Sequence, residues 1–352
     1  MSYTLRATKR EYNNWKKAFN KKKAAPEKPD FRRIGLMDPS IGTSNMGDFI
    51  IQDAVKSVLR ETFPDSFVST FPTQLSRKMD SVQLMQDQDV IFIGGTNLLA
   101  SNMEARFQWK VTPIDSYFIP NKMVLFGTGW WQYQDKPNAY TQNLYSGLLS
   151  KSLLHSVRDS YSRDMLKSIG IENVVNTSCP TLWNINPAHC KSIQTSKASD
   201  VITTLTFYNK DFKQDAAMIK MLQQNYDHVY VWIQGFEDME YLHQLAPDMK
   251  KIISVHPDLH FYDEILKRHN DIEYVGTRLH AGIRAIQHGK RTLIVAVDNR
   301  AQEIGKDTNL NVIKREDLDR ALNFVTKPYV TDIQLPVDAI ALWKNQFNKT
   351  SF

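Results

Sequence analysis

The sequence predicts an α/β fold of two Rossmann-like domains that face each other across a cleft. From about residue 33 onward, short apolar runs alternate with helical patterns, which is typical of βα units and a parallel sheet. The alternation forms two successive series separated by a looser stretch at 185–200. At 352 residues the chain is also long for a single core. We expect an N-terminal domain over residues 31–190 and a C-terminal domain over residues 191–330.

The first series contains five expected strands, two of which run directly into glycine-containing turns. A helical pattern at 47–63 follows the first strand, and another at 160–170 lies between the last two. In parallel sheets, ligands bind off the carboxyl ends of the strands, so the residues that follow each strand are the candidates for function. The expected strands are 34–40, 90–97, 123–131, 153–159 and 173–180.

The second series contains five more expected strands with helical segments between them. It is followed by a terminal segment, 331–352, in which residues 337–347 have the pattern of an amphipathic helix. No tandem repeat interrupts either series. The expected strands are 201–208, 228–235, 251–257, 272–276 and 291–298.

The formal charge of +6 is concentrated in an N-terminal arm, residues 1–30. Residues 1–28 hold nine lysines and arginines against two glutamates, a net +7, which leaves −1 for the rest of the chain. The body therefore has no basic excess, and we expect no nucleic-acid partner. For the arm two interpretations stay open: a solvated tail, or a short amphipathic helix at 12–19 that touches an anionic membrane surface.

Composition excludes several classes of protein. With 42% hydrophobic and 23% charged residues the chain is neither disordered nor fibrous. It contains no uncharged apolar run of transmembrane length and no apolar core of a secretory signal, so we expect a cytoplasmic protein, with a peripheral position at the inner face of the membrane left open. Cys179 and Cys190 are expected to be free thiols, and no metal site or cofactor is expected.

Two candidate ligand-binding clusters follow strands of the first series. Asn45, Gly47 and Asp48 form a polar turn that enters a helix, where backbone N–H groups are able to hold an anion or a hydroxyl-rich ligand. The alternative is an ordinary turn and helix cap. The second cluster, 94–97, has adjacent glycines that let the backbone approach a ligand, and Trp130 is a candidate for stacking on a sugar unless it belongs to the core.

Two further clusters carry arginines. Arg158 ends an apolar strand, where it requires either its neighbour Asp159 or a bound anion as partner. Gly276 ends another strand and is followed by Arg278 and His280 at the start of a helical pattern. A fixed cation beside a titratable imidazole suits an anionic substrate that undergoes proton transfer.

Taken together, these motifs resemble those of the polysaccharide pyruvyl transferase family. Their order and spacing agree with the family over about residues 34 to 310. In this chain they read Asn45-Met46-Gly47-Asp48, Gly94-Gly95-Thr96, Arg158-Asp159-Ser160-Tyr161-Ser162 and Gly276-Thr277-Arg278-Leu279-His280. Three positions depart from the family pattern: Thr96 replaces a third glycine, Cys179 precedes Pro180 where Asp-Pro is expected, and 297–300 replaces Tyr-Asp-x-Lys.

The resemblance implies a GT-B-like fold and a pyruvyltransferase activity. The enzyme would transfer a pyruvyl group from phosphoenolpyruvate, as a ketal, to a saccharide of an exopolysaccharide, capsule or cell-wall polymer, without a cofactor and with an acceptor that is free or lipid-linked. The donor residues would be Arg158, Gly276, Arg278 and Leu279, with His280 and the two arginines catalytic. The acceptor residues would be Asn45, Gly47, Asp48, Gly94, Gly95, Thr96 and Trp130.

Two other functions remain compatible with the same architecture. One is a nucleotide-sugar glycosyltransferase, in which Arg278 would hold a diphosphate. The other is a non-catalytic member of the family that binds a saccharide or serves as a scaffold, which the three departures from the pattern keep open. The oligomeric state is not predicted.

Overall fold

The computed structural model describes residues 3–23, 31–106, 108–245 and 250–349, which fold into two compact units. Unit 1 comprises Met1–Gly42, Val55–Asn176 and Asp338–Phe352, and unit 2 comprises Thr43–Ala54 and Thr177–Val337. These two units divide the chain at other residues than the boundary expected at 190/191. Residues 43–54 and 177–190 belong to unit 2, because they pack against its sheet, and the terminal helix belongs to unit 1.

Unit 1 is built on a four-stranded parallel sheet in the order β2-β1-β3-β4, with a two-stranded parallel sheet, β5-β6, beside β4. The central strand β3 is buried along its whole length, as its continuous apolar run predicts. The elements are α1 (Tyr3–Lys23), β1 (Arg32–Asp38), α2 (Met46–Thr62), β2 (Ser66–Pro72), α3 (Met79–Gln86), β3 (Val90–Gly94), α4 (Pro113–Phe118), β4 (Met123–Phe126), α5 (Ala139–Leu148), β5 (His155–Val157), α6 (Ser160–Lys167), β6 (Val174–Asn176) and α14 (Val337–Lys349); α2 begins in the segment assigned to unit 2.

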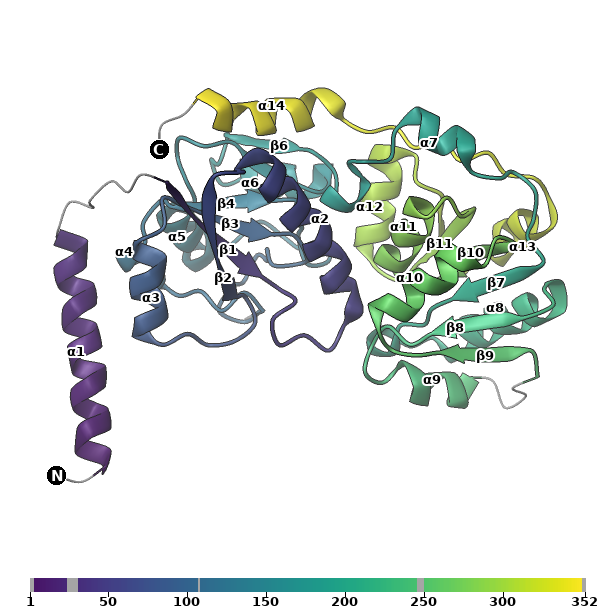
Figure 1. Cartoon of the computed structure of the whole chain (residues 1–352), viewed down its shortest axis with the longest axis horizontal. Coiled ribbons are helices and arrows are strands. Elements are labelled where there is room, and N and C mark those ends of the chain that lie inside the picture. Colours follow the sequence, from purple (N-terminus) through teal and green to yellow (C-terminus); the bar gives the residue numbers. More distant parts are fainter. Residues whose placement is uncertain (1–2, 24–30, 107, 246–249, 350–352) are drawn as a thin grey trace. The chain divides into compact units, whose positions relative to one another are not determined.

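The C-terminal helix α14 closes one face of the unit 1 sheet with aromatic side chains. Trp343 is fully buried and stacks on Phe126 of β4 at 4.4 Å between ring centroids, and Phe347 packs edge-on against Phe92 of β3. Such aromatic contacts are worth more than the apolar area that they bury. These contacts make the helix part of unit 1 (Figure 1).

The basic N-terminal segment forms a 21-residue helix, α1, rather than a tail. Ala18 is buried against Phe118, Met79 and Val82 of α4 and α3, and Lys21 forms an ion pair with Asp87. Residues 1–2 and 24–30 of the predicted arm lie outside the described residues. The solvated-tail interpretation is thus wrong for residues 3–23, because one face of the helix has apolar neighbours.

Unit 2 contains a six-stranded parallel sheet in the order β12-β11-β10-β7-β8-β9, with helices on both faces. All five strands predicted for the second series are present, and the short edge strand β12 is added to them. The elements are η1 (Pro180–Leu182), α7 (Pro187–Ser192), β7 (Asp200–Thr203), η2 (Phe207–Asn209), α8 (Phe212–Asn225), β8 (Val229–Trp232), α9 (Asp238–Leu245), β9 (Ile252–Val255), α10 (Leu259–Arg268), β10 (Ile272–Gly276), α11 (Leu279–Gln287), β11 (Thr292–Ala296), α12 (Asn299–Thr308), β12 (Val312–Lys314) and α13 (Leu318–Thr326).

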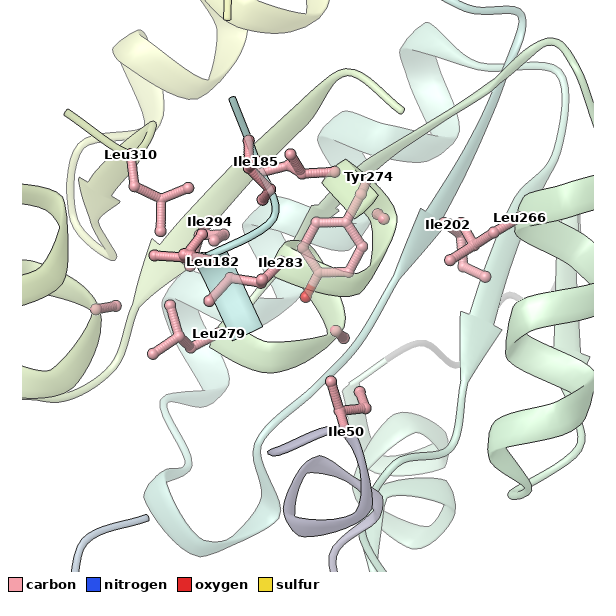
Figure 2. Close-up of a cluster of buried hydrophobic side chains, with 14 of the residues drawn as sticks. Ile50, Leu182, Ile185, Ile202, Leu266, Tyr274, Leu279, Ile283, Ile294 and Leu310 are labelled. Atoms are coloured by element: carbon pink, nitrogen blue, oxygen red, sulfur yellow. The ribbon is translucent and has the colours of Figure 1, made fainter. Parts of the chain in front are cut away.

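Neighbouring residues of the unit 2 strands enter different cores, because successive side chains of a strand point to opposite faces. Ile202, Tyr274 and Ile294 join Leu182 and residues of α10, α11 and α12 in the cluster that Figure 2 shows. The residues one position away, on the same three strands, pack instead with α8, α9 and α13. This arrangement places the N-terminus of α11 at the carboxyl end of β10.

The predicted fold class, an α/β protein of two Rossmann-like domains, is confirmed: each unit has its own parallel sheet with helices around it. No helix in the part of the chain that the structure describes is both long enough and apolar enough to cross a membrane.

Candidate active site

A small polar pocket lies in unit 2 beyond the carboxyl ends of β10, β8 and β11. Its free volume is about 10 Å³, which is space for about one water molecule. In this conformation the enclosed part of the pocket is therefore small. The lining residues are Asn45, Tyr208, Gln234, Thr277, Arg278, Leu279, His280, Val297, Asp298, Arg300 and Ala301.

Arg278 is the buried cation of this pocket. It stands at the N-cap of α11 with its side chain 3% exposed. Its Nε donates to the Leu205 carbonyl at 2.6 Å, and its Nη2 donates to both carboxylate oxygens of Asp238 at 2.7 and 2.9 Å. Nη1 is buried and has no hydrogen-bond partner among the described residues. A buried donor without a partner costs stability, so this nitrogen marks the place where an anionic ligand would be stabilised.

Asp238, which the sequence analysis did not single out, holds the guanidinium in place. It is fully buried, and it accepts hydrogen bonds from the backbone N–H groups of Gly235 and Phe207. Burial raises the pKa of this carboxyl, and the charge of Arg278 opposes the rise. Two glycines permit the close packing: a Cβ at Gly235 would lie 2.3 Å from Nη2 of Arg278, and one at Gly276 would lie 2.7 Å from the Thr204 backbone nitrogen.

Tyr208 and Arg300 stand at the mouth of the pocket and were also missed. The Arg278 guanidinium carbon lies 4.8 Å from the centre of the Tyr208 ring, in a cation–π contact. The Tyr208 hydroxyl accepts a hydrogen bond from Arg300 Nη2 at 2.7 Å, and Arg300 Nε donates to Asp298 at 2.9 Å. Burial acts to lower the pKa of Arg300, but Asp298 and Tyr208 hold it well above its ordinary value. Because Tyr208 is half exposed, it is the residue most free to move aside.

His280 lines the pocket from the first turn of α11 and is 6% exposed. Its Nε2 lies 3.7 Å from the sulfur of Cys179, which immediately precedes η1. The pairing of His280 with Arg278, predicted from their spacing of two residues, thus gives an imidazole and a guanidinium in one pocket.

Of the polar turn at 45–48, only Asn45 lines this pocket. Its Oδ1 accepts hydrogen bonds from the Gly47 backbone at 3.1 Å and from Gln234 Nε2 at 2.8 Å, and a Cβ at position 47 would lie 2.8 Å from that same Nε2. Asp48 is buried and accepts a hydrogen bond from Thr43 at 2.7 Å, as a turn residue does. The turn therefore belongs with Arg278 and His280 in unit 2.

Arg158 lies in unit 1 and is 1% exposed. Its Nε donates to Asp159 at 3.0 Å, and Asp159 also caps α6 by accepting from the Ser162 backbone. A Cβ at Gly129 would lie 2.1 Å from the guanidinium carbon, so only glycine allows the arginine this position. The ion pair with Asp159, one of the two partners considered from the sequence, is present; the proximity of Arg158 to Arg278 stays a prediction.

Trp130 is a core residue of unit 1. Its ring is fully buried, packs edge-on against Tyr145 and donates through Nε1 to Gln134 at 3.1 Å. Its ring therefore has no exposed face for stacking on a sugar, and the core alternative describes it correctly.

Comparison with known proteins decides the family. A family model described as polysaccharide pyruvyl transferase matches residues 45–299. The chain belongs to this family. A search of curated proteins found no match.

Solved structures that resemble this pyruvyl transferase family member have low identity to it. A UDP-N-acetylglucosamine 2-epimerase is 10% identical, with 90% of this chain and 91% of that chain covered and a TM-score of 0.45. The UDP-GlcNAc 2-epimerase from Neisseria meningitidis, bound to UDP-GlcNAc, is also 10% identical over 90% of this chain and 94% of that chain, with a TM-score of 0.41. The E. coli heptosyltransferase WaaC is 10% identical over 75% and 88% of the two chains, with a TM-score of 0.37.

Thr96, one of the departures from the pyruvyl transferase pattern, has a left-handed backbone. Gly94 ends β3, Gly95 follows with φ of 72°, and Thr96 has φ of 56° while being 6% exposed. A β-branched residue is rare in this region, whereas glycine adopts it freely. The backbone at position 96 is thus one that glycine adopts without strain, and Thr96 adopts it here at a cost in strain.

Thr96→Gly is expected to be more stable than Thr96→Ala by about 1 kcal/mol. Both variants lose the hydroxyl, but only alanine retains a Cβ in the left-handed conformation. Chemical denaturation of the two proteins measures the difference. If alanine proves the more stable, as it would at an ordinary backbone position, the turn is not strained.

Proposed function

We propose that this protein transfers a pyruvyl group from phosphoenolpyruvate to a saccharide, as a ketal, in the synthesis of an exopolysaccharide, capsule or cell-wall polymer. The observation that carries the proposal is Nη1 of Arg278, which is buried in the same pocket as His280 and has no hydrogen-bond partner in the part of the chain that the structure describes. Membership of the pyruvyl transferase family supports the reaction type. The pocket offers a fixed positive charge and a proton carrier, which are what an anionic enol phosphate requires.

In the proposed reaction both hydroxyl protons of the acceptor are accounted for. One proton reaches the methylene carbon of phosphoenolpyruvate through His280, which leaves a cationic centre at the carbon that bears the phosphate. The two acceptor hydroxyl oxygens form bonds to that carbon, its bond to the phosphate oxygen breaks, and the second proton leaves with inorganic phosphate. Arg278, together with Arg158 from unit 1, would bind the phosphate and carboxylate of the donor.

The remaining assignments are parts of the same proposal. Gly276 and Leu279 flank Arg278 at the strand–helix junction and would shape the donor site. Asn45 lines the donor pocket, so we place it beside the donor and beside an acceptor hydroxyl. The residues proposed for the acceptor side are Gly47, Asp48, Gly94, Gly95 and Thr96, without Trp130.

Thermal unfolding with added ligands tests the proposal. Phosphoenolpyruvate at 100 times its dissociation constant is expected to stabilise the native protein by about 2.7 kcal/mol. The gain is expected to be lost in Arg278→Lys, which keeps the charge but lacks the forked donors, and retained in Arg268→Ala, which removes an arginine that is 81% exposed. Inorganic phosphate and pyruvate, added singly, control for simple anion binding.

The same experiment separates the competing functions. Stabilisation by uridine or guanosine diphosphate, in place of phosphoenolpyruvate, would mean a nucleotide-sugar glycosyltransferase. If neither phosphoenolpyruvate nor either nucleotide stabilises the protein, the result would contradict pyruvyl transfer and favour a non-catalytic saccharide-binding member of the family.

We also propose that α1 brings the enzyme to an anionic membrane that carries a lipid-linked acceptor. Ala18 faces the body, while Arg6, Lys9, Lys16 and Lys17 of the same helix are exposed, with Lys9 and Lys16 opposite Ala18. Tyr12 is 66% exposed on the same helix. Lysines and arginines near an anionic surface contribute about 1 kcal/mol each, and aromatic rings favour the interface.

Replacing these four basic residues with serine is expected to weaken binding to vesicles of phosphatidylglycerol and phosphatidylcholine at least about tenfold. Four exposed lysines of unit 2, Lys191, Lys213, Lys220 and Lys306, provide a control with the same change of charge. Co-sedimentation measures both proteins. An equal loss in the control would show attraction by net charge alone, and no loss in the α1 variant would remove the membrane proposal.

A further inference from the structure

We propose that Cys179 is a positioning residue that sets the protonation state and orientation of the His280 ring. The two groups are both buried in unit 2, with the Cys179 sulfur 3.7 Å from His280 Nε2. The inference rests on the proposed function only for its catalytic consequence, since the pairing itself is a property of the fold. It assigns a role to one of the departures from the family pattern.

The hydrogen bonds at the sulfur direct a proton toward the imidazole. The Thr181 hydroxyl donates to the Cys179 sulfur at 3.1 Å, so the sulfur acts as an acceptor on that side. A proton shared by the pair then lies between the sulfur and Nε2: as a thiol that donates to a neutral imidazole, or as a thiolate that accepts from an imidazolium. In the first form the neutral imidazole carries its hydrogen atom on Nδ1, and in the second form both ring nitrogens carry one.

The backbone around Cys179 is held so that the sulfur faces α11. Ser178, the preceding residue, is fully buried and left-handed, with φ of 61°, a conformation that costs energy for any residue except glycine. On the other side, Gln287 of α11 donates to the Thr181 carbonyl at 2.5 Å, and Leu182 packs with Leu279 in the core that Figure 2 shows. Strained backbone that packing maintains is typical of functional positions.

The other charged groups that line the pocket make such a partner useful to His280. Arg278 is paired with Asp238 and Arg300 with Asp298, so an imidazolium would add a third positive charge against two carboxylates; the Tyr208 hydroxyl accepts from Arg300. A sulfur that becomes a thiolate as the imidazole gains its proton keeps the net charge of the pair at zero. Cys179 would thereby let His280 hold a proton beside two arginines.

Nitrogen-15 NMR of the imidazole rings, recorded from pH 5 to 9 on the full chain, tests the pairing without reference to catalysis. The His280 signals are identified by their absence in His280→Gln. In Cys179→Ala we expect a changed tautomer ratio and a shifted titration midpoint. In Cys179→Asp we expect the midpoint to rise by about 1–3 pH units, because a carboxylate within about 4–6 Å favours the imidazolium. Cys179→Ser, the closest in shape, is expected to lie nearest to the wild type.

Cys190→Ser is the matched control, because Cys190 is the other buried thiol of unit 2 and lies on α7. It is expected to leave the His280 signals unchanged. Identical His280 tautomers and midpoints in wild type, Cys179→Ala and Cys179→Asp would overturn the proposal. Should Cys179→Ala fail to fold, Cys179→Asp still decides it, because an unmoved His280 midpoint in that variant would overturn the proposal.

The effect of Cys179 on catalysis is measured separately from the NMR titration. If phosphate is released from phosphoenolpyruvate in the presence of methyl hexosides, the pH profile of kcat should move with the NMR midpoint from variant to variant. An unmoved profile beside a moved midpoint would overturn the catalytic role of Cys179. A moved midpoint without any phosphate release, with methyl hexosides and with a lipid-linked saccharide as acceptors, would leave the pairing established and contradict pyruvyl transfer instead.

Discussion

Replacing Arg278 with alanine is expected to lower the free energy of unfolding by about 3–5 kcal/mol, as for other buried ion pairs that lose one partner. The substitution leaves Asp238, which is fully buried, without its counter-charge. Burial already raises the pKa of this carboxyl in the presence of the arginine. Without the arginine, Asp238 either stays charged, at a high cost in folding free energy, or takes up a proton. Chemical denaturation near pH 7 measures the loss.

A double-mutant cycle with Asp238→Asn identifies the cause. Asparagine removes the unpaired charge and retains one oxygen to accept from the backbone N–H of Gly235 or Phe207. The two substitutions together should therefore cost less than the sum of the single changes, with an interaction of about 2 kcal/mol or more. Strict additivity would show that the pair does not stabilise the pocket.

The pair of Arg268 and Glu264 on α10 is the control for this cycle. It has the same chemistry, but its arginine is 81% exposed. Arg268→Ala should change stability by about 0.5 kcal/mol or less, because exposed pairs are screened by solvent. The comparison separates a general effect of removing arginine from the effect of burial at Asp238.

The strands that are buried on both faces were predictable from the sequence, whereas two of the edge strands, β2 and β12, were not. Residues 90–94 and 292–296 read as continuous apolar runs because both faces of each strand are covered. β2, at the edge of its sheet, has mostly half-buried or exposed residues, and β12 is only three residues long. Neither segment has a hydrophobic pattern in its sequence that distinguishes it from a loop. Both become strands because they pair with a neighbouring strand in the folded sheet.

The candidate site was predictable only where its residues are close in sequence. Arg278 and His280 follow one strand, so their common location follows from the strand–helix junction. Asp238, Tyr208 and Arg300 come from three other segments and meet at Arg278 only in the folded sheet. Asp238 and Arg300 each follow a predicted strand closely and Tyr208 ends one, and that was the one signal available in the sequence. Which of many such residues converge depends on strand order, β11-β10-β7-β8, which periodicity does not reveal.

His280→Gln is expected to lower kcat for phosphate release from phosphoenolpyruvate by about 10²–10⁴-fold, the range for loss of a general acid or base. Glutamine has a size near that of histidine and forms hydrogen bonds, but it does not exchange a proton at neutral pH. The rate is measured with methyl hexosides as acceptors. Wild-type activity in this variant would exclude His280 as the proton carrier.

The same variant, His280→Gln, separates an effect on the chemical step from an effect on donor binding. Since Arg278 and its ion pair with Asp238 remain, phosphoenolpyruvate should still stabilise His280→Gln against thermal unfolding. A loss in kcat with retained binding means that the imidazole acts in the transition state. His288→Gln is the matched control, because His288 caps the other end of α11 and pairs with Asp263 at 3.2 Å. If both variants lose activity equally, the effect belongs to the stability of the helix, and His280 is a structural residue.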